Sequence, residues 1–229
     1  MTINSFLTLL VSKIGFLLML GVTMSANAGA FGLGGDSWKE EVLLHDGSKI
    51  IVERMVKRGG RHELGQNPPI GEQSLAFTLP GTKQRVIWHD HYSEDVGGSN
   101  FNPMLLEIVK GMPYVLVSPA GCVSYNKWGR PNPPYVVFIY ESKEWKRISL
   151  QELPAEITLP NLVISSPDDI AKSAKNGLVS AEMVRQANDG YSQPEYKTIL
   201  REPLPQERCR QYSSGPKAPI PITPPRSLK

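Results

Sequence analysis

The stretch WKEEVLLHDGSKIIVERMV, residues 38–56, decides the fold class because it has the pattern of a β-hairpin. Two apolar runs, 42–44 and 50–52, flank the dipeptide Asp46-Gly47. Asp-Gly is favoured in the tight primed turns that join two antiparallel strands. The stretch therefore predicts an antiparallel pair of strands with a tight turn between them.

Three further segments have the same pattern of two apolar runs around a turn. They are residues 74–91, with Pro80-Gly81 at the bend, residues 105–117 and residues 135–148. Together the four hairpins predict a mainly β fold, an antiparallel sandwich or barrel-like sheet of about eight to nine short strands. A small propeller-like β fold is the alternative, although the hairpins show no fixed repeat period.

The character of the sequence changes after residue 165, where two short helices are expected near residues 167–189. Ser166 is a suitable N-cap residue, Pro167 suits the first helical position, and Ser180 can cap the second helix. The following segment, residues 195–203, is expected to return as a final strand. The sequence thus predicts a small C-terminal helical pair attached to the β fold.

The N-terminus has the features of a signal peptide, which we place at residues 1–28. Lys13 is its only charge, the apolar run 14–22 follows, and Ala26 and Ala28 are small residues at the positions that a signal peptidase reads. The run is much shorter than the roughly 20 residues that span a bilayer. We therefore expect cleavage, export to the periplasm or the extracellular space, and no transmembrane segment in the mature chain.

The mature chain is expected to form one β-rich domain, residues 29–202, followed by a proline-rich basic tail, residues 203–229. Its two cysteines are Cys122 and Cys209. Two cysteines in an exported protein usually form a disulfide. The sequence therefore predicts a Cys122–Cys209 disulfide that ties the tail to the domain.

The segment GCVSYNKWGRPNPPYVVFIY, residues 121–140, combines aromatic, amide and cationic side chains with three prolines. Trp, Tyr and Arg are the usual energetic centres of interfaces, and a stiff backbone loses little entropy on binding. We expect a surface that recognises a protein or glycan of the cell envelope; its residues are Tyr125, Asn126, Trp128, Arg130, Asn132 and Tyr135. In the alternative, these aromatic side chains are buried and the segment closes the fold.

A second candidate site is the His-x-His pair His89 and His91. In a strand these two side chains share one face, and such a pair can hold zinc. The further ligands that the sequence suggests are Asp90, Glu94, Asp95, His45 and His62. A solvated turn is the alternative interpretation, and no cofactor other than zinc is expected.

Several functional classes leave no trace in the sequence. It contains no G-x-S-x-G, G-x-G-x-x-G, phosphate-loop or C-x-x-C motif. The net charge of +3 is weak and the protein is exported, so nucleic acid is not an expected partner. Arg54, Lys57, Arg58 and Arg61 are expected in a solvated loop. The sequence predicts a non-catalytic binding or envelope-associated module, with a metal-dependent periplasmic or secreted enzyme as the alternative.

Overall fold

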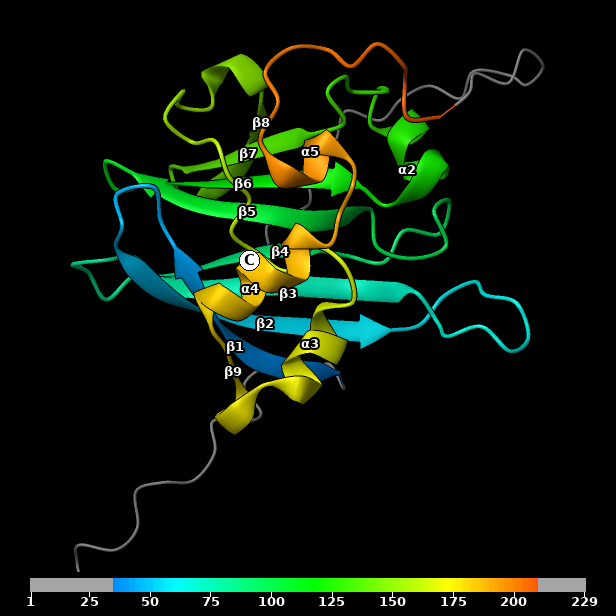
Figure 1. Ribbon diagram of the computed structural model, residues 1–229, viewed down its shortest axis with the longest axis horizontal. Coiled ribbons are helices and arrows are strands. Elements are labelled where there is room, and N and C mark those ends of the chain that lie inside the picture. The colour runs from blue at the N-terminus through cyan, green and yellow to red at the C-terminus, as the bar shows by residue number, and fades with distance from the viewer. Residues whose placement is uncertain (1–34, 210–229) are drawn as a thin grey trace, which may run out of the picture. The chain divides into compact units, whose positions relative to one another are not determined.

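The computed structural model describes residues 35–209, so the predicted signal peptide and most of the proline-rich tail lie outside the described residues. The strands form a five-stranded sheet in the order β4-β3-β2-β1-β9 and a four-stranded sheet in the order β5-β6-β7-β8 (Figure 1). The strands are β1 (Asp36–Leu43), β2 (Lys49–Arg58), β3 (Ile70–Thr78), β4 (Arg85–Asp90), β5 (Phe101–Val109), β6 (Met112–Pro119), β7 (Val136–Glu141), β8 (Glu144–Ile148) and β9 (Leu178–Val179). The predicted mainly β fold is confirmed.

All four predicted hairpins are present as the antiparallel pairs β1–β2, β3–β4, β5–β6 and β7–β8. The first turn differs from the expected two-residue form. Leu44 N–H donates to Ser48 O at 2.8 Å, Gly47 N–H donates to Leu44 O at 3.0 Å, and Gly47 alone has a positive φ, 83°. This is the three-residue loop in which a glycine follows a type I turn, so Asp46 keeps an ordinary backbone conformation.

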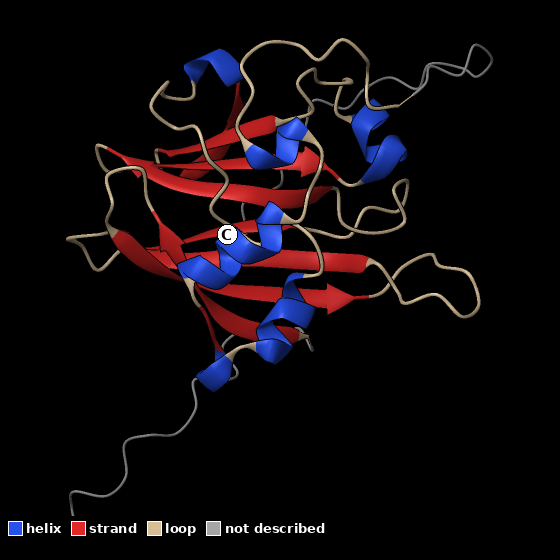
Figure 2. Cartoon of the chain, in the orientation of Figure 1, coloured by secondary structure: helices blue, strands red, loops and turns tan. Residues whose placement is uncertain are grey.

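The main core lies between the two sheets. Because side chains alternate along a strand, every second residue of each sheet faces the other sheet. The core includes Val52 and Trp88 from one sheet and Phe101, Val115 and Phe138 from the other. Figure 2 shows the strands in two separate layers, and within residues 35–209 neither sheet closes on itself. The fold is therefore a sandwich, and not a barrel or a propeller.

The later part of the chain covers the outer face of the four-stranded sheet, and it also packs on part of the face of the five-stranded sheet that carries the main core. The helices are α2 (Gly121–Lys127), α3 (Pro167–Ser173), α4 (Ala181–Asp189) and α5 (Pro194–Lys197), with short 3-10 turns η2 (Leu150–Glu152) and η3 (Lys175–Gly177). Val184 of α4 packs with Trp38, Val56 and Val179. Trp38 and Val56 lie on the same face of the five-stranded sheet as the core residues Val42 and Val52, because each pair is four residues apart on one strand. The predicted helical pair is thus confirmed as α3 and α4.

The two predicted helix caps differ. Ser180 caps α4, since its Oγ accepts a hydrogen bond from Met183 N–H at 3.3 Å. Ser166 precedes α3 with a left-handed φ of 46° and makes no capping bond. The expected strand over 195–203 is wrong: the segment forms α5 and then irregular backbone. Pro194 suits the start of a helical turn, and Ile199 N–H makes a single bond, to Thr158 O, so no ladder develops.

Two of the arginines expected in a solvated loop belong to strand β2: Arg54 is buried and Arg58 is partly buried. Arg54 has a relative exposure of 1% and binds the carboxylate of Glu40 at 3.0 Å. Arg58 makes two 2.7 Å bonds to the buried carboxylate of Asp168, which lies in the first turn of α3. The expectation is wrong for these residues because carboxylates brought from other strands and helices neutralise them inside the fold.

The predicted disulfide is confirmed. Cys122 at the start of α2 and Cys209 at the end of the described chain are joined, with a Cα–Cα distance of 5.7 Å, within the usual range for a disulfide. The two residues are 87 positions apart in the sequence. The disulfide therefore fastens the start of the tail to the domain.

We expect reduction of this disulfide to lower the free energy of unfolding by about 2–4 kcal/mol, because it removes a constraint on a long loop of the unfolded chain. Urea unfolding of the protein with and without reductant measures the loss. A Cys122→Ser, Cys209→Ser variant is the control, since reductant should leave its midpoint unchanged. Equal midpoints for oxidised and reduced wild type would contradict the prediction.

Within residues 35–209, no helix is both long and apolar enough to cross a membrane.

Candidate metal centre

The aromatic side chains of residues 121–140 lie inside the protein. Tyr125, Trp128 and Tyr135 have relative exposures of 0%, 5% and 4%. The Trp128 ring packs against Phe101 with a centroid distance of 4.5 Å. Tyr135 donates its hydroxyl hydrogen bond to a backbone carbonyl, at 2.7 Å. This burial favours the alternative in which the segment closes the fold.

The polar side chains of the same segment bind the last described residues of the chain. Arg130 donates to Cys209 O at 2.5 Å and to Asn126 Oδ1 at 2.5 Å. Asn132 makes two bonds with the backbone of Leu204, at 2.8 and 2.9 Å. Recognition of a protein or glycan through these residues stays a prediction, but the contacts give them an internal role beside the disulfide.

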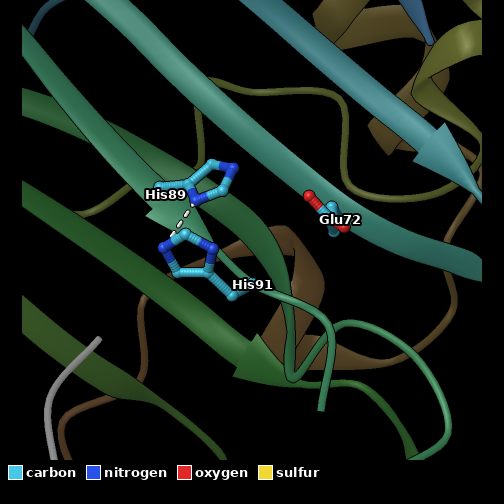
Figure 3. Close-up of side chains that lie close together, drawn as sticks. All are labelled: Glu72, His89 and His91. Atoms are coloured by element: carbon cyan, nitrogen blue, oxygen red, sulfur yellow. Dashed lines mark hydrogen bonds between the residues drawn. The ribbon is translucent and has the colours of Figure 1, made fainter. Parts of the chain in front are cut away.

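A cluster of ligating side chains lies on the β3–β4 hairpin. Figure 3 shows Glu72 on β3 beside His89, at the end of β4, and His91, which directly follows β4. Ser74 pairs with His89 in the register of the two strands, and side chains alternate along each strand. Glu72, His89 and His91 therefore share one face of the sheet, and one ligand atom from each lies within 4.8 Å of the others.

The two imidazoles are in direct contact. His89 Nδ1 lies 2.8 Å from His91 Nε2, so one of these nitrogens carries a hydrogen that the other accepts (Figure 3). Burial, and then the charge of His91, lower the pKa of His89 to about 4. His89 is therefore neutral at neutral pH, which is the form that binds metal ions.

Glu72 is the member of the cluster that the sequence analysis missed. It is half-buried and its carboxylate lies 3.6 Å from Lys57 Nζ, its cross-strand neighbour on β2. The antiparallel register of β3 and β4 places it there: Gln73 pairs with Asp90, so Glu72, the residue before Gln73, lies beside His91, the residue after Asp90. Sequence spacing alone does not reveal such a neighbour, because it comes from another strand.

Asp90, a suggested zinc ligand, lies on the opposite face of the hairpin. Its carboxylate has a relative exposure of 2% and accepts hydrogen bonds from the backbone N–H groups of Asn100 and Phe101, at 3.1 and 2.8 Å. Burial raises its pKa to about 6 even though these donors favour the charged form. Asp90 therefore binds the backbone at the start of β5 and does not join the cluster.

The remaining suggested ligands do not join the cluster that the described residues form; they are Glu94, Asp95, His45 and His62. Asp95 binds Lys127 at 2.8 Å, and His45 binds Glu107 at 3.0 Å. The ligand set is therefore two imidazoles and one carboxylate. This set suits zinc, and three protein ligands leave one coordination position for a water or another molecule.

Comparison of the chain with protein-family models, with curated proteins and with solved structures found no match.

Proposed function

We propose that this protein is an exported metal-binding module that holds one zinc ion with Glu72, His89 and His91. A single observation carries the proposal: ligand atoms from these three residues lie within 4.8 Å of one another on one face of a β-hairpin. Two residues of the set lie on paired strands, so little ordering is needed when the ion binds.

The choice of ion follows from the ligands. Imidazole nitrogens suit zinc and its transition-metal neighbours, whereas Mg²⁺ and Ca²⁺ prefer sites built from oxygen ligands. The low pKa of His89 keeps this imidazole neutral at neutral pH, so one of its ring nitrogens has a lone pair for the metal. Zinc binding then has to displace only the hydrogen that the two imidazoles share.

Export is supported by two independent features. Residues 1–28 have the pattern of a signal peptide. The Cys122–Cys209 disulfide is of a kind that forms and persists in oxidising compartments. The proposed site of action is therefore the periplasm or the extracellular space, where a cell-envelope protein or glycan is the proposed partner.

A metal-dependent enzyme is the second candidate, and the number of ligands favours it. Three protein ligands with a free fourth position are typical of catalytic zinc sites, in which the metal activates a water molecule. This candidate requires zinc-dependent turnover, such as ester hydrolysis that a chelator abolishes. A zinc-loaded protein without such turnover is the outcome that the binding module predicts.

We expect the untagged protein to bind one Zn²⁺ per chain and His91→Ala to weaken binding roughly a hundredfold or more, because the loss leaves only two ligands. Isothermal titration with ZnCl₂ measures the affinity. Zinc at a hundred times its dissociation constant should also stabilise the wild type by about 2.7 kcal/mol, which a thermal-shift assay detects.

The matched control is His62→Ala, which removes an exposed histidine outside the cluster. This variant should bind zinc as the wild type does, and MgCl₂ should produce no shift with either protein. The proposal fails if zinc leaves the melting temperature of the wild type unchanged. It also fails if His62→Ala loses as much affinity as His91→Ala.

A further inference from the structure

A pocket of about 740 Å³ lies away from the proposed zinc site. Its walls come from the β1–β2 turn, the segment before residue 162, α4 and α5. In Figure 1 these two helices lie in front of the sheets. Pockets of roughly 300–1,000 Å³ with apolar walls and a few polar groups are typical of small-ligand sites.

Part of the pocket wall is apolar and unusually exposed. Leu43 and Leu159 both line the pocket, with relative exposures of 45% and 65%. Beneath them Leu44, Ile157 and Val184 are buried and also reach the pocket. An apolar ligand placed here would remove two leucines from water, which is favourable at about 25 cal/mol per Å² of buried surface.

Most charges around the pocket neutralise one another. Arg185 binds both Glu182 and Asp189 at 2.7 Å, and Lys49 binds Glu41 at 2.8 Å. Within residues 35–209, two charged residues of the wall enter no hydrogen bond or ion pair: Glu156 and Lys197. The pocket therefore offers one carboxylate and one ammonium group without a hydrogen bond or ion pair beside an apolar wall, and the charge of Glu156 also contributes to the raised pKa of His45.

His45 adds a directed hydrogen-bond donor to the same wall. Its Nδ1 lies 3.0 Å from the carboxylate of Glu107, and this carboxylate also accepts the His45 backbone N–H at 2.9 Å. Glu107 is buried, and its hydrogen bond raises the pKa of His45. Because Nδ1 is occupied, Nε2 is the nitrogen that can donate to a ligand.

We propose that this pocket binds a short apolar peptide in its zwitterionic form. The apolar side chains lie against Leu43 and Leu159, and the ammonium group is attracted by Glu156. The carboxylate is attracted by Lys197 and hydrogen-bonded by His45. A fatty acid lacks the ammonium group and an amine lacks the carboxylate, so neither matches both free charges. This inference does not depend on the zinc site.

Isothermal titration with tri-leucine tests the proposal on the full mature protein. We expect saturable binding of the peptide with free termini, and binding at least about fivefold weaker for the N-acetylated, C-amidated peptide, since charged hydrogen bonds are lost. No saturable binding, or equal binding of the two peptides, would overturn the proposal. Tight binding of a fatty acid such as decanoate would also overturn it.

Variants locate the site. Glu156→Gln and Lys197→Met alter exposed side chains, so both proteins should fold, and each should bind tri-leucine about fivefold more weakly. Glu202→Gln and Lys83→Met change exposed charges outside the pocket and should bind as the wild type does. Equal affinities for all four variants would place the peptide elsewhere and refute the assignment. A chelator should leave peptide binding unchanged, which separates this result from the zinc proposal.

Discussion

Trp128→Ala is expected to lower the free energy of unfolding by about 3–5 kcal/mol, the usual loss when a buried aromatic ring leaves a cavity. The Trp128 ring packs against Phe101 and Phe138, with centroid distances of 4.5 and 6.1 Å. Its Nε1–H also points to Asn100 Oδ1 at 3.3 Å. Neighbours on two sides, from β5 and β7, limit how far the site can collapse.

Urea unfolding followed by circular dichroism measures the effect, and Tyr92→Ala is the matched control. Tyr92 is an aromatic residue with a relative exposure of 44%, so its truncation should cost less than about 1 kcal/mol. Both variants should also be tested for retention of envelope proteins and glycans in a pull-down. Unchanged stability of Trp128→Ala together with lost retention would contradict the core role and support recognition through residues 121–140.

The hairpins were predictable because their signals are local. A strand pair needs two apolar runs and a turn residue, and residues 38–56 contain all three within nineteen positions of the chain. The exact turn was not predictable, since Asp46-Gly47 suits both the two-residue and the three-residue loop. The disulfide was predictable because the chain has two cysteines, which allow a single intramolecular pairing.

The candidate sites were harder to predict because they join residues from separate strands. His89 and His91 are visible as a pair in sequence, but Glu72 lies on another strand and becomes a partner only through the β3–β4 register. The residues that line the pocket are even further apart in the sequence, since Leu43 and Lys197 come from opposite ends of the described chain. Long-range pairing thus limits what a single sequence reveals about chemistry.

Burial was the second limit. Tyr125 and Trp128 have the composition of an interface, yet interface centres and protein cores use the same aromatic residues. The neighbouring prolines and amides gave no means of choosing between the two. In the structure Trp128 packs in the main core, and Arg130 and Asn132 of the same segment bind the backbone of Cys209 and Leu204.

The ion pair between Glu40 and Arg54 is buried, so the loss of either partner is expected to destabilise the fold strongly. The two side chains have relative exposures of 0% and 1%, and Arg54 Nη1 lies 3.0 Å from Glu40 Oε2. Val163 completes the site: its N–H donates to Glu40 Oε1 and its carbonyl accepts from Arg54, both at 2.8 Å. The pair therefore joins β1 and β2 to the segment before α3.

Arg54→Met is expected to lower the free energy of unfolding by about 3–5 kcal/mol, because it leaves the Glu40 carboxylate buried without its partner. The double variant Glu40→Leu, Arg54→Met should lose less than this single variant, since no buried charge remains. Urea unfolding of the wild type, the two single variants and the double variant forms a double-mutant cycle that measures the difference.

An exposed pair on the same sheet supplies the control. Glu53 and Arg85 are joined across strands β2 and β4 at 2.6 Å, but their side chains have relative exposures of 50% and 43%. Glu53→Gln should therefore cost no more than about 1 kcal/mol. A double variant of Glu40 and Arg54 that loses the sum of the two single losses would show that the pair is not coupled. The contribution of Glu40 and Arg54 to the stability of the wild type would then come from packing against Trp38 and Val163 and not from the neutralisation of buried charge.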